Sequence, residues 1–217
     1  DLPRLATAHS LQLLDLSTMI AAALLLLVTA QPAQDPWTTL EGTTPAQWRL
    51  VWTSQPSQEL TVSWTTLEPG KEHSVHYDLV ARAGTGAPYA QLAPAHRSGQ
   101  YTLDETEVGK ITSAHYHHAR ITGLEPSTTY WFQIESDGER SRELHFQTGP
   151  ADDRPFKLLH GGDSRTGIED RQQINRFISQ LADEHPDLIA FAHGGDYIIW
   201  GKFWAHWRPW LSQNELT

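Results

Sequence analysis

A four-residue motif, His-Gly-Gly-Asp, occurs twice in this sequence and holds its best candidates for chemistry. The two HGGD motifs are residues 160–163 and 193–196, and each ends on a carboxylate, Asp163 and Asp196. Paired glycines let the backbone come close to a metal ion or a phosphate group. A carboxylate after such a pair can bind a cation. The repeat therefore predicts two related acidic loops.

Each HGGD motif follows a short apolar run, and an amphipathic segment lies between them. The runs, 156–159 and 188–192, have the length and composition of buried strands. Residues 166–169 match a capping box, and His185-Pro186 is expected to end the helix. The apolar residues with helical spacing are Ile174, Phe177, Ile178 and Leu181. This order predicts a βαβ unit with parallel strands and both motifs at one sheet edge.

That arrangement brings Asp163 and Asp196 together, because ligands bind at the carboxyl ends of the strands in open α/β sheets. Two carboxylates held close repel one another, and a cation between them removes the repulsion. The hypothesis is half of a metal site. The alternative is an ordinary turn, since Asp after Gly-Gly is common turn chemistry. Repetition at matching strand ends favours the site.

Composition limits the possible partners. The 217 residues carry a formal net charge of −10, which argues against nucleic acid as a partner. There is no cysteine, so disulfides and thiolate metal sites are excluded. This fits either a reducing compartment or a secreted bacterial protein.

The amino-terminal region contains a candidate export signal. Residues 20–28 are an apolar run too short for a membrane span, and Val28-Thr29-Ala30 resembles a signal peptidase site. Met19 is the only methionine. We expect a signal peptide at 19–30, with 1–18 as an upstream extension, and a secreted or periplasmic protein without a stable membrane span. The alternative is a buried apolar helix.

In the middle of the chain, apolar and polar residues alternate with a period of two. After a linker at 31–45, short alternating or β-branched runs separated by turn residues predict an antiparallel sandwich of about seven strands at 46–150. The runs are 48–52, 60–64, 74–77, 116–121, 129–135 and 143–147. Residues 82–110 are poorly patterned and are expected to be a long loop with at most two edge strands.

Residues 123–130, Gly-Leu-Glu-Pro-Ser-Thr-Thr-Tyr, resemble the tyrosine corner of fibronectin type III domains. Together with Tyr116-His117-His118 and residues 60–66, they make 46–150 similar to the N-terminal sandwich of purple acid phosphatases. The resemblance implies that a calcineurin-like metallophosphoesterase domain follows. The expected fold is an all-β fibronectin type III-like sandwich and then, at 156–217, the first βαβ unit of an incomplete α/β domain.

The resemblance also implies site roles. Asp163 would bind one metal ion and Asp196 would bridge two, from Fe, Zn or Mn, in the hydrolysis of a phosphate ester. Arg165 stands where many phosphodiesterases have a histidine ligand, and it could contact a phosphate oxygen or lie in solvent. Ile199 stands at the position of the tyrosine ligand of purple acid phosphatases, and Tyr197 is out of register.

Three histidines of residues 115–118 form a second candidate group. In a strand, His115 and His117 share one face and His118 points to the other, so the three cannot bind one ion. Strand histidines with partial burial are the better interpretation, and we leave them out of the site.

The family motifs Gly-Asn-His and Gly-His-x-His do not occur in the sequence. We therefore expect a fragment of a longer enzyme, inactive by itself and of low stability over 151–217, where a strand edge stays unpaired. Apolar residues at helical spacing from Phe203 to Leu211 are expected to be a core stripe. The rival function is a non-catalytic extracellular fibronectin-like binding module. A diguanylate cyclase fails because neither Gly-Gly-Asp continues with Glu-Phe.

Overall fold

A computed structural model describes residues 37–101 and 113–217, and residues 37–217 form one compact unit. The expected upstream extension, the signal peptide and the linker up to residue 36 lie outside the described residues. Within the described part, no helix is both long and apolar enough to cross a membrane.

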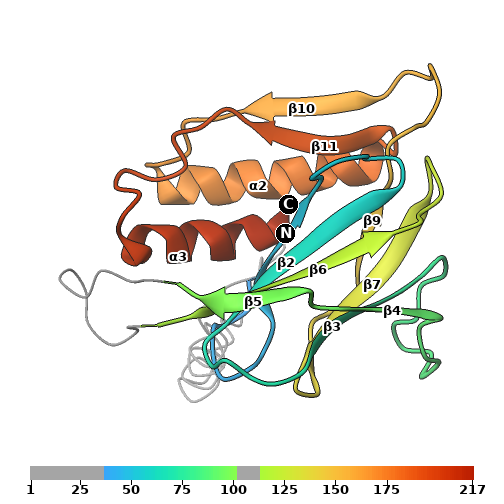
Figure 1. Ribbon diagram of the computed structural model, residues 1–217. Coiled ribbons are helices and arrows are strands. Elements are labelled where there is room, and N and C mark those ends of the chain that lie inside the picture. The colour runs from blue at the N-terminus through green and yellow to red at the C-terminus, as the bar shows by residue number, and fades with distance from the viewer. Residues whose placement is uncertain (1–36, 102–112) are drawn as a thin grey trace, which may run out of the picture. The chain divides into compact units, whose positions relative to one another are not determined.

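Residues up to Gln147 form a sandwich of two antiparallel sheets (Figure 1). The first sheet has the order β1-β2-β6-β5 and the second has β4-β3-β7-β8, with β9 also paired to β7. The strands of the first sheet are β1 (Ala46–Val51), β2 (Glu59–Thr66), β5 (Arg97–Gln100) and β6 (His115–Thr122). Those of the second are β3 (His73–Asp78), β4 (Gln91–Pro94), β7 (Thr129–Ser136), β8 (Glu139–Arg140) and β9 (Leu144–Gln147). The predicted sandwich is confirmed.

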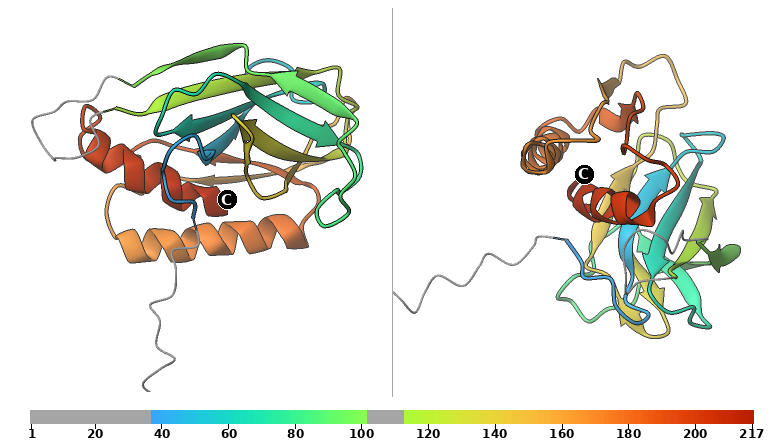
Figure 2. Two further views of the ribbon diagram at one scale, coloured as in Figure 1. Left: turned by 90° about the horizontal axis from the view of Figure 1, so that it is seen from below. Right: turned by 90° about the vertical axis from the view of Figure 1, so that its left-hand side faces the viewer.

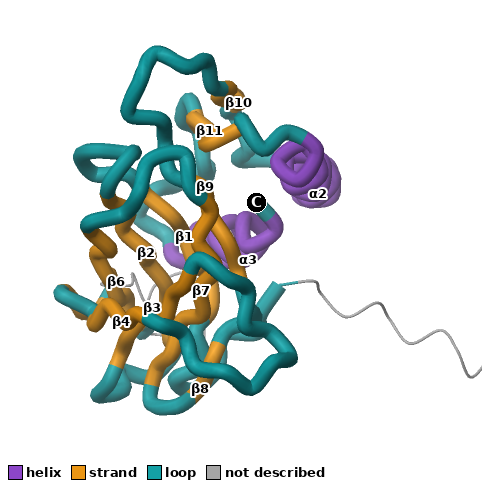
Figure 3. Tube along the Cα trace, turned by 90° about the vertical axis from the view of Figure 1, so that its right-hand side faces the viewer, coloured by secondary structure: helices purple, strands orange, loops and turns teal. Residues whose placement is uncertain are grey.

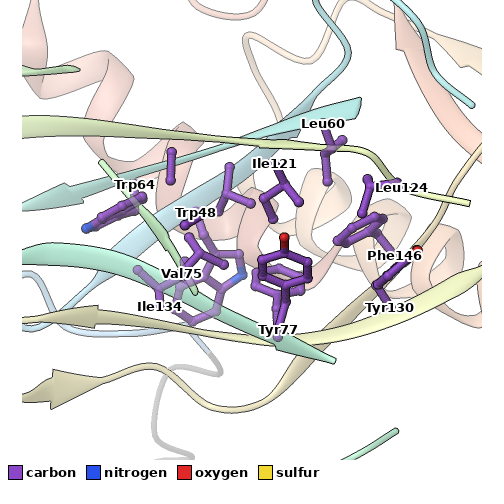
Figure 4. Packing of buried hydrophobic residues seen from close by; sticks show 14 residues of the cluster. Trp48, Leu60, Trp64, Val75, Tyr77, Ile121, Leu124, Tyr130, Ile134 and Phe146 are labelled. Atoms are coloured by element: carbon purple, nitrogen blue, oxygen red, sulfur yellow. The ribbon is translucent and has the colours of Figure 1, made fainter. Parts of the chain in front are cut away.

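The core lies between the two sheets, where alternate residues of each strand meet (Figure 4). Trp64 of β2 is fully buried, and its indole Nε1 donates to Ser136 Oγ at 3.0 Å. Phe132 and Ile134 of β7 are also fully buried. Burial of each such large side chain stabilises the fold by about 1.5–3 kcal/mol.

The tyrosine corner is present. The hydroxyl oxygen of Tyr130 accepts a hydrogen bond from the backbone N–H of Glu125 at 2.9 Å. The poorly patterned segment at 82–110 contributes β4 and β5, each at the edge of its sheet, as predicted. The two-residue strand β8 was not predicted, because a ladder this short has no recognisable period.

A buried histidine of β6 has a fully determined set of hydrogen bonds. The Thr66 hydroxyl donates to Glu68 O at 2.6 Å, so its oxygen accepts from His117 Nε2 at 2.9 Å. Ser98 Oγ then donates to His117 Nδ1 at 2.9 Å. The ring also stacks on His73 with 3.7 Å between centroids. These bonds require a neutral imidazole, which agrees with the interpretation as a strand histidine rather than a ligand.

This arrangement predicts acid sensitivity of the sandwich. The pKa of His117 is lowered from 6.5 to about 3, mainly because burial disfavours the charged ring and also because His73 lies beside it. The unfolded chain takes up a proton near pH 6.5 that the folded chain excludes. Stability should therefore fall as the pH drops below 6.5, by about 1.4 kcal/mol per pH unit and roughly 3 kcal/mol at pH 4.5.

Urea unfolding from pH 7 to 4.5, followed by tryptophan fluorescence, measures this loss. His117→Gln should be less stable at pH 7 but have a flatter pH dependence. His96→Gln, at an exposed histidine, is the control and should keep the wild-type slope. An unchanged slope in His117→Gln would refute the assignment.

A βαβ unit follows the sandwich, as predicted. It consists of β10 (Lys157–Gly161), α2 (Ile168–Glu184) and β11 (Leu188–His193). The two strands pair in parallel, with Gly161 opposite His193, so both HGGD motifs leave the sheet at the same edge. Figure 3 shows α2 on one side of the strand pair.

The start of α2 differs from the prediction. Its N-cap is Gly167, at φ +63°, and no side chain caps the helix, so the expected capping box at 166–169 is wrong. Glycine adopts this left-handed conformation without steric cost, and it is among the residues tolerated at a helix N-cap. The helix ends at Glu184 and His185 is its C-cap, as expected.

The buried face of α2 also differs. Of the predicted apolar stripe, Ile178 is buried, but Ile174 and Phe177 are 56% and 57% exposed. The other buried residues of the helix are Asn175, one turn before Ile178, and Arg171, two turns before it. They are buried because polar groups at the end of the next helix accept their hydrogen bonds.

The strands of this unit are not buried as expected either. Leu158 of β10 is 54% exposed, and every residue of β11 is at least partly exposed. These strands are exposed because the described residues form only a two-stranded sheet here, and such a small sheet cannot cover its own faces.

The last helix, α3 (Trp204–Gln213), continues into a 3-10 turn, η1 (Asn214–Leu216). Its predicted core stripe is confirmed in part: Phe203, Trp204 and Leu211 are buried, whereas Trp207 and Trp210 are partly buried. The helix packs with Leu40 and Ala46 at the end of the sandwich. Helices α2 and α3 lie beside one another in both views of Figure 2.

A buried carboxylate fastens η1 to the sandwich. Glu215 accepts hydrogen bonds from the backbone N–H groups of Thr38, at 2.8 Å, and of Gln47. The side-chain amide of Gln47 donates through Nε2 to Arg208 O and to Ser212 Oγ, both at 3.1 Å. These contacts place α3, and the residues that it holds, against the sandwich.

Candidate functional site

The two HGGD motifs pair with each other directly beyond the ends of β10 and β11. The backbone N–H of Gly194 donates to Gly161 O at 2.6 Å, and that of Asp163 donates to Gly195 O at 3.0 Å. A side chain on Gly162 would meet the backbone of Gly194 and Gly195 at 3.4 Å. The two loops thus approach to van der Waals distance, and small residues at these positions leave room for the approach.

Each motif ends on a residue in the left-handed region. Asp163 has φ 53° and Asp196 has φ 55°, and Gly195 before the latter has φ 107°. Aspartate tolerates this region better than most residues because its short side chain can form local hydrogen bonds. The matching backbone turns bring both carboxylates out at the same edge of the sheet.

The carboxylates of Asp163 and Asp196 share one cation, the guanidinium of Arg165. Its Nε lies 3.1 Å from Asp163 Oδ1, and its Nη1 lies 3.1 Å from Asp196 Oδ1. The three side chains are 69%, 52% and 43% exposed, in the order Asp163, Asp196, Arg165. Water screens such pairs, so each contributes at most about 1 kcal/mol to stability. These ion pairs matter because they show that the two carboxylates face the same position, which a cation can occupy.

Behind the carboxylates, a serine and a histidine hold the two motifs together. The backbone N–H of Gly195 donates to His193 Nδ1 at 3.2 Å, which places the proton of the neutral ring on Nε2. That Nε2–H donates to Ser164 Oγ at 2.9 Å, and Trp210 Nε1 of α3 donates to the same oxygen at 2.9 Å. The ring of His193 stacks on Tyr197, 4.2 Å between centroids.

This histidine stays neutral at pH 7. Its pKa is lowered, mainly because burial disfavours the charged ring and also because His160 is nearby. A neutral His193 is what the hydrogen bond from Gly195 requires. The role of His193 is thus to position the loops, and it is not one of the groups that face Arg165.

Helices α2 and α3 support the same loop. Arg171 donates through Nη1 to Ser164 O at 2.7 Å and through Nε to Gln213 Oε1 at 2.6 Å. Asn175 donates to Gln213 O at 2.9 Å. Burial lowers the pKa of Arg171 because it disfavours the charged guanidinium. The backbone next to Asp163 is therefore fixed by contacts from both helices.

The oxygen donors of Asp163 and Asp196 suit a hard metal cation and fit part of a two-metal centre. They do not complete one: residues 37–101 and 113–217 contain no group of three acidic, histidine or cysteine side chains placed to bind an ion. Tyr197 donates to His193 O at 3.4 Å and stacks on that ring, so it belongs to the support of the loop. Ile199, where the resemblance would place a tyrosine ligand, is half exposed.

The sequence predicted Asp163, Asp196 and Arg165 as site residues, and all three lie together. Their roles as metal ligands and phosphate contact stay predictions. The supporting residues Ser164, His193, Trp210 and Arg171 were not predicted. The repeated histidine of the HGGD motif was a signal for His193, whereas nothing local marks Arg171.

A hollow of about 940 Å³ lies between the sandwich and the carboxyl-terminal segment. Its wall is rich in aromatic side chains, which include Trp48, Trp52, Trp204 and Trp207. His193 and Tyr197 line it, but the two carboxylates and Arg165 do not. It is therefore distinct from the carboxylate pair.

Comparison with known proteins relates the sandwich to a described family. Residues 45–148 match a family model described as "Purple acid Phosphatase, N-terminal domain". Purple acid phosphatase 13 of Arabidopsis thaliana is 30% identical to this chain over 91 residues, which are 40% of this chain and 16% of that protein.

Among solved structures, purple acid phosphatase PPD1 isolated from yellow lupin (Lupinus luteus) seeds is similar over 80% of this chain and 33% of that chain. The TM-score is 0.58 and the sequence identity 17%, so this likeness shows a shared fold. The chain spans only a minor part of the length of either relative.

Proposed function

We propose that the chain is part of a metal-dependent phosphoesterase, a proposal supported by the match of residues 45–148 to the purple acid phosphatase N-terminal domain. In this proposal Asp163 and Asp196 supply two of the metal ligands. The observation that carries it is the convergence of both carboxylates on one cation position, 3.1 Å from the same guanidinium.

The resemblance to purple acid phosphatases implies two metal ions, drawn from Fe, Zn and Mn. Such ions would lower the pKa of the attacking water and polarise the phosphate ester. The residues of this chain position that chemistry. Asp163 and Asp196 hold the cations at the sheet edge, and the backbone hydrogen bonds from Gly194 to Gly161 and from Asp163 to Gly195 keep the two loops together. The proposed substrate is a phosphate ester.

Arg165 is proposed to contact the phosphate. A guanidinium is planar and offers parallel N–H donors that match two phosphate oxygens. Its 43% exposure leaves it accessible to a substrate in solvent. It stands two residues after Asp163, which keeps it near the metal position.

Export is part of the proposal. The apolar run at 20–28 and the small residues at 28–30 support a signal peptide that starts near Met19 and delivers the protein to a secreted or periplasmic location. Mass spectrometry of the exported protein should find residues 19–30 removed, and their retention would contradict the export proposal.

Hydrolysis of p-nitrophenyl phosphate by the product of the complete gene tests the proposed activity. We expect turnover that a chelator abolishes and that added divalent metal restores. Turnover that persists after exhaustive chelation would contradict a metal-dependent reaction. If the complete product does not hydrolyse phosphate esters with any of the metals, the rival function as an extracellular binding module is the better one.

A further inference from the structure

Arg165 makes one contact to each carboxylate of the pair. Its Nε is used on Asp163 and its Nη1 on Asp196, so one planar group spans both HGGD motifs. An arginine that neutralised only Asp163 would contact that carboxylate alone. The guanidinium thus occupies the position that both acidic groups face.

We propose that Arg165 is an internal counter-cation that holds the paired HGGD loops and competes with a metal ion for Asp163 and Asp196. This inference rests on the proposed function, in which the same carboxylates bind metal. It adds a residue that sets the metal affinity of the site. Metal binding then requires the guanidinium to leave its two oxygens.

The competition follows from charge and distance. A divalent ion between the two carboxylates would lie within a few ångströms of a guanidinium that contacts both of them. At about 4 Å in water, repulsion between a double and a single positive charge weakens binding on the order of tenfold or more. The same oxygen, Oδ1, of each carboxylate would also have to exchange one partner for the other.

The release of Arg165 has a limited cost. Both of its ion pairs are solvent-exposed, so breaking each costs at most about 1 kcal/mol, and breaking both lowers the metal affinity on the order of tenfold without preventing binding. The guanidinium can move into water when a metal ion arrives, because 43% of the side chain is already exposed. Ser164, by contrast, is held by Arg171, Trp210 and His193, so the loop itself stays in place.

Titration of the full chain with Mn²⁺, by calorimetry and by electron paramagnetic resonance, tests the competition. We expect Arg165→Gln to bind Mn²⁺ at least about tenfold more tightly than the wild type. Arg154→Gln is the matched control, because Arg154 makes a similar exposed pair with Asp152 at 2.6 Å, and it should bind like the wild type. Without metal, Arg165→Gln should also melt at a lower temperature, and saturating Mn²⁺ should close that gap.

The results separate this inference from the proposed function. Equal or weaker binding by Arg165→Gln, or no binding by either protein, overturns the competition. Adding Asp196→Asn to Arg165→Gln should remove the gained affinity. If the gain survives in the double variant, the ion binds elsewhere, and the ligand assignment of the proposed function fails together with this inference.

Discussion

Asp196→Ala in the complete gene product is expected to lower the hydrolysis of p-nitrophenyl phosphate by a factor on the order of 10³ or more, about 4 kcal/mol of transition-state stabilisation. In the family resemblance Asp196 bridges both metal ions, so its loss affects the binding of each. Its position supports this, because its carboxylate shares a cation position with Asp163, the other proposed ligand. Steady-state kinetics with saturating metal measure the effect.

The matched control is Asp187→Ala. Asp187 precedes β11, at the opposite end of the strand from Asp196, and pairs with Lys157 at 2.9 Å on the surface. It should keep wild-type turnover, since an exposed ion pair contributes little. Equal turnover in Asp196→Ala and Asp187→Ala would remove the case for Asp196 as a ligand.

Glu215→Ala is expected to destabilise the protein by roughly 3 to 5 kcal/mol, because buried donors would lose their acceptor. Glu215 is 3% exposed and accepts from the backbone of Thr38 and of Gln47, which is itself fully buried. Burial raises the pKa of Glu215, as expected for a carboxyl in a low-dielectric setting. Alanine would leave the two N–H groups unpaired and release η1 from the sandwich.

Chemical denaturation, with tryptophan fluorescence as the signal, measures this loss. The tryptophans of α3 should report its release as a red shift at low denaturant. Glu215→Gln keeps one acceptor oxygen and should lose about half as much stability. Glu139→Ala, at an exposed position of β8, should have no effect. A wild-type midpoint for Glu215→Ala would show that η1 is not what fastens this end of the chain.

Much of the fold follows from local patterns. The strands around Trp64 and Tyr130 alternate with a period of two, and the turn at 123–130 specifies its own hydrogen bond, so the sandwich could be predicted. The βαβ unit follows from a change of period between two apolar runs. Because parallel strands end at the same edge, the approach of Asp163 to Asp196 needed no long-range information.

The parts that could not be predicted depend on residues distant in sequence. Arg171 and Asn175 are buried because Gln213 at the end of α3 accepts their hydrogen bonds, whereas the periodicity of α2 favoured Ile174 and Phe177. A stripe of apolar residues indicates which face of a helix can be buried. It does not indicate which other element of the fold packs against that face.

The shared contact of Arg165 has a similar origin. It requires left-handed backbone at both Asp163 and Asp196, and this comes from the pairing of the two loops. From sequence, Arg165 could be assigned only to phosphate or to solvent. Its position between two carboxylates was not among the alternatives.

The most direct test of the shared carboxylate site is an anomalous difference map from crystals of the full chain grown with Mn²⁺. We predict one peak between the two HGGD motifs, within coordination distance of a carboxylate oxygen of Asp163 and of Asp196, with the guanidinium of Arg165 moved away. Carboxylates that point apart, with no ion between them at saturating Mn²⁺, would contradict the proposed site.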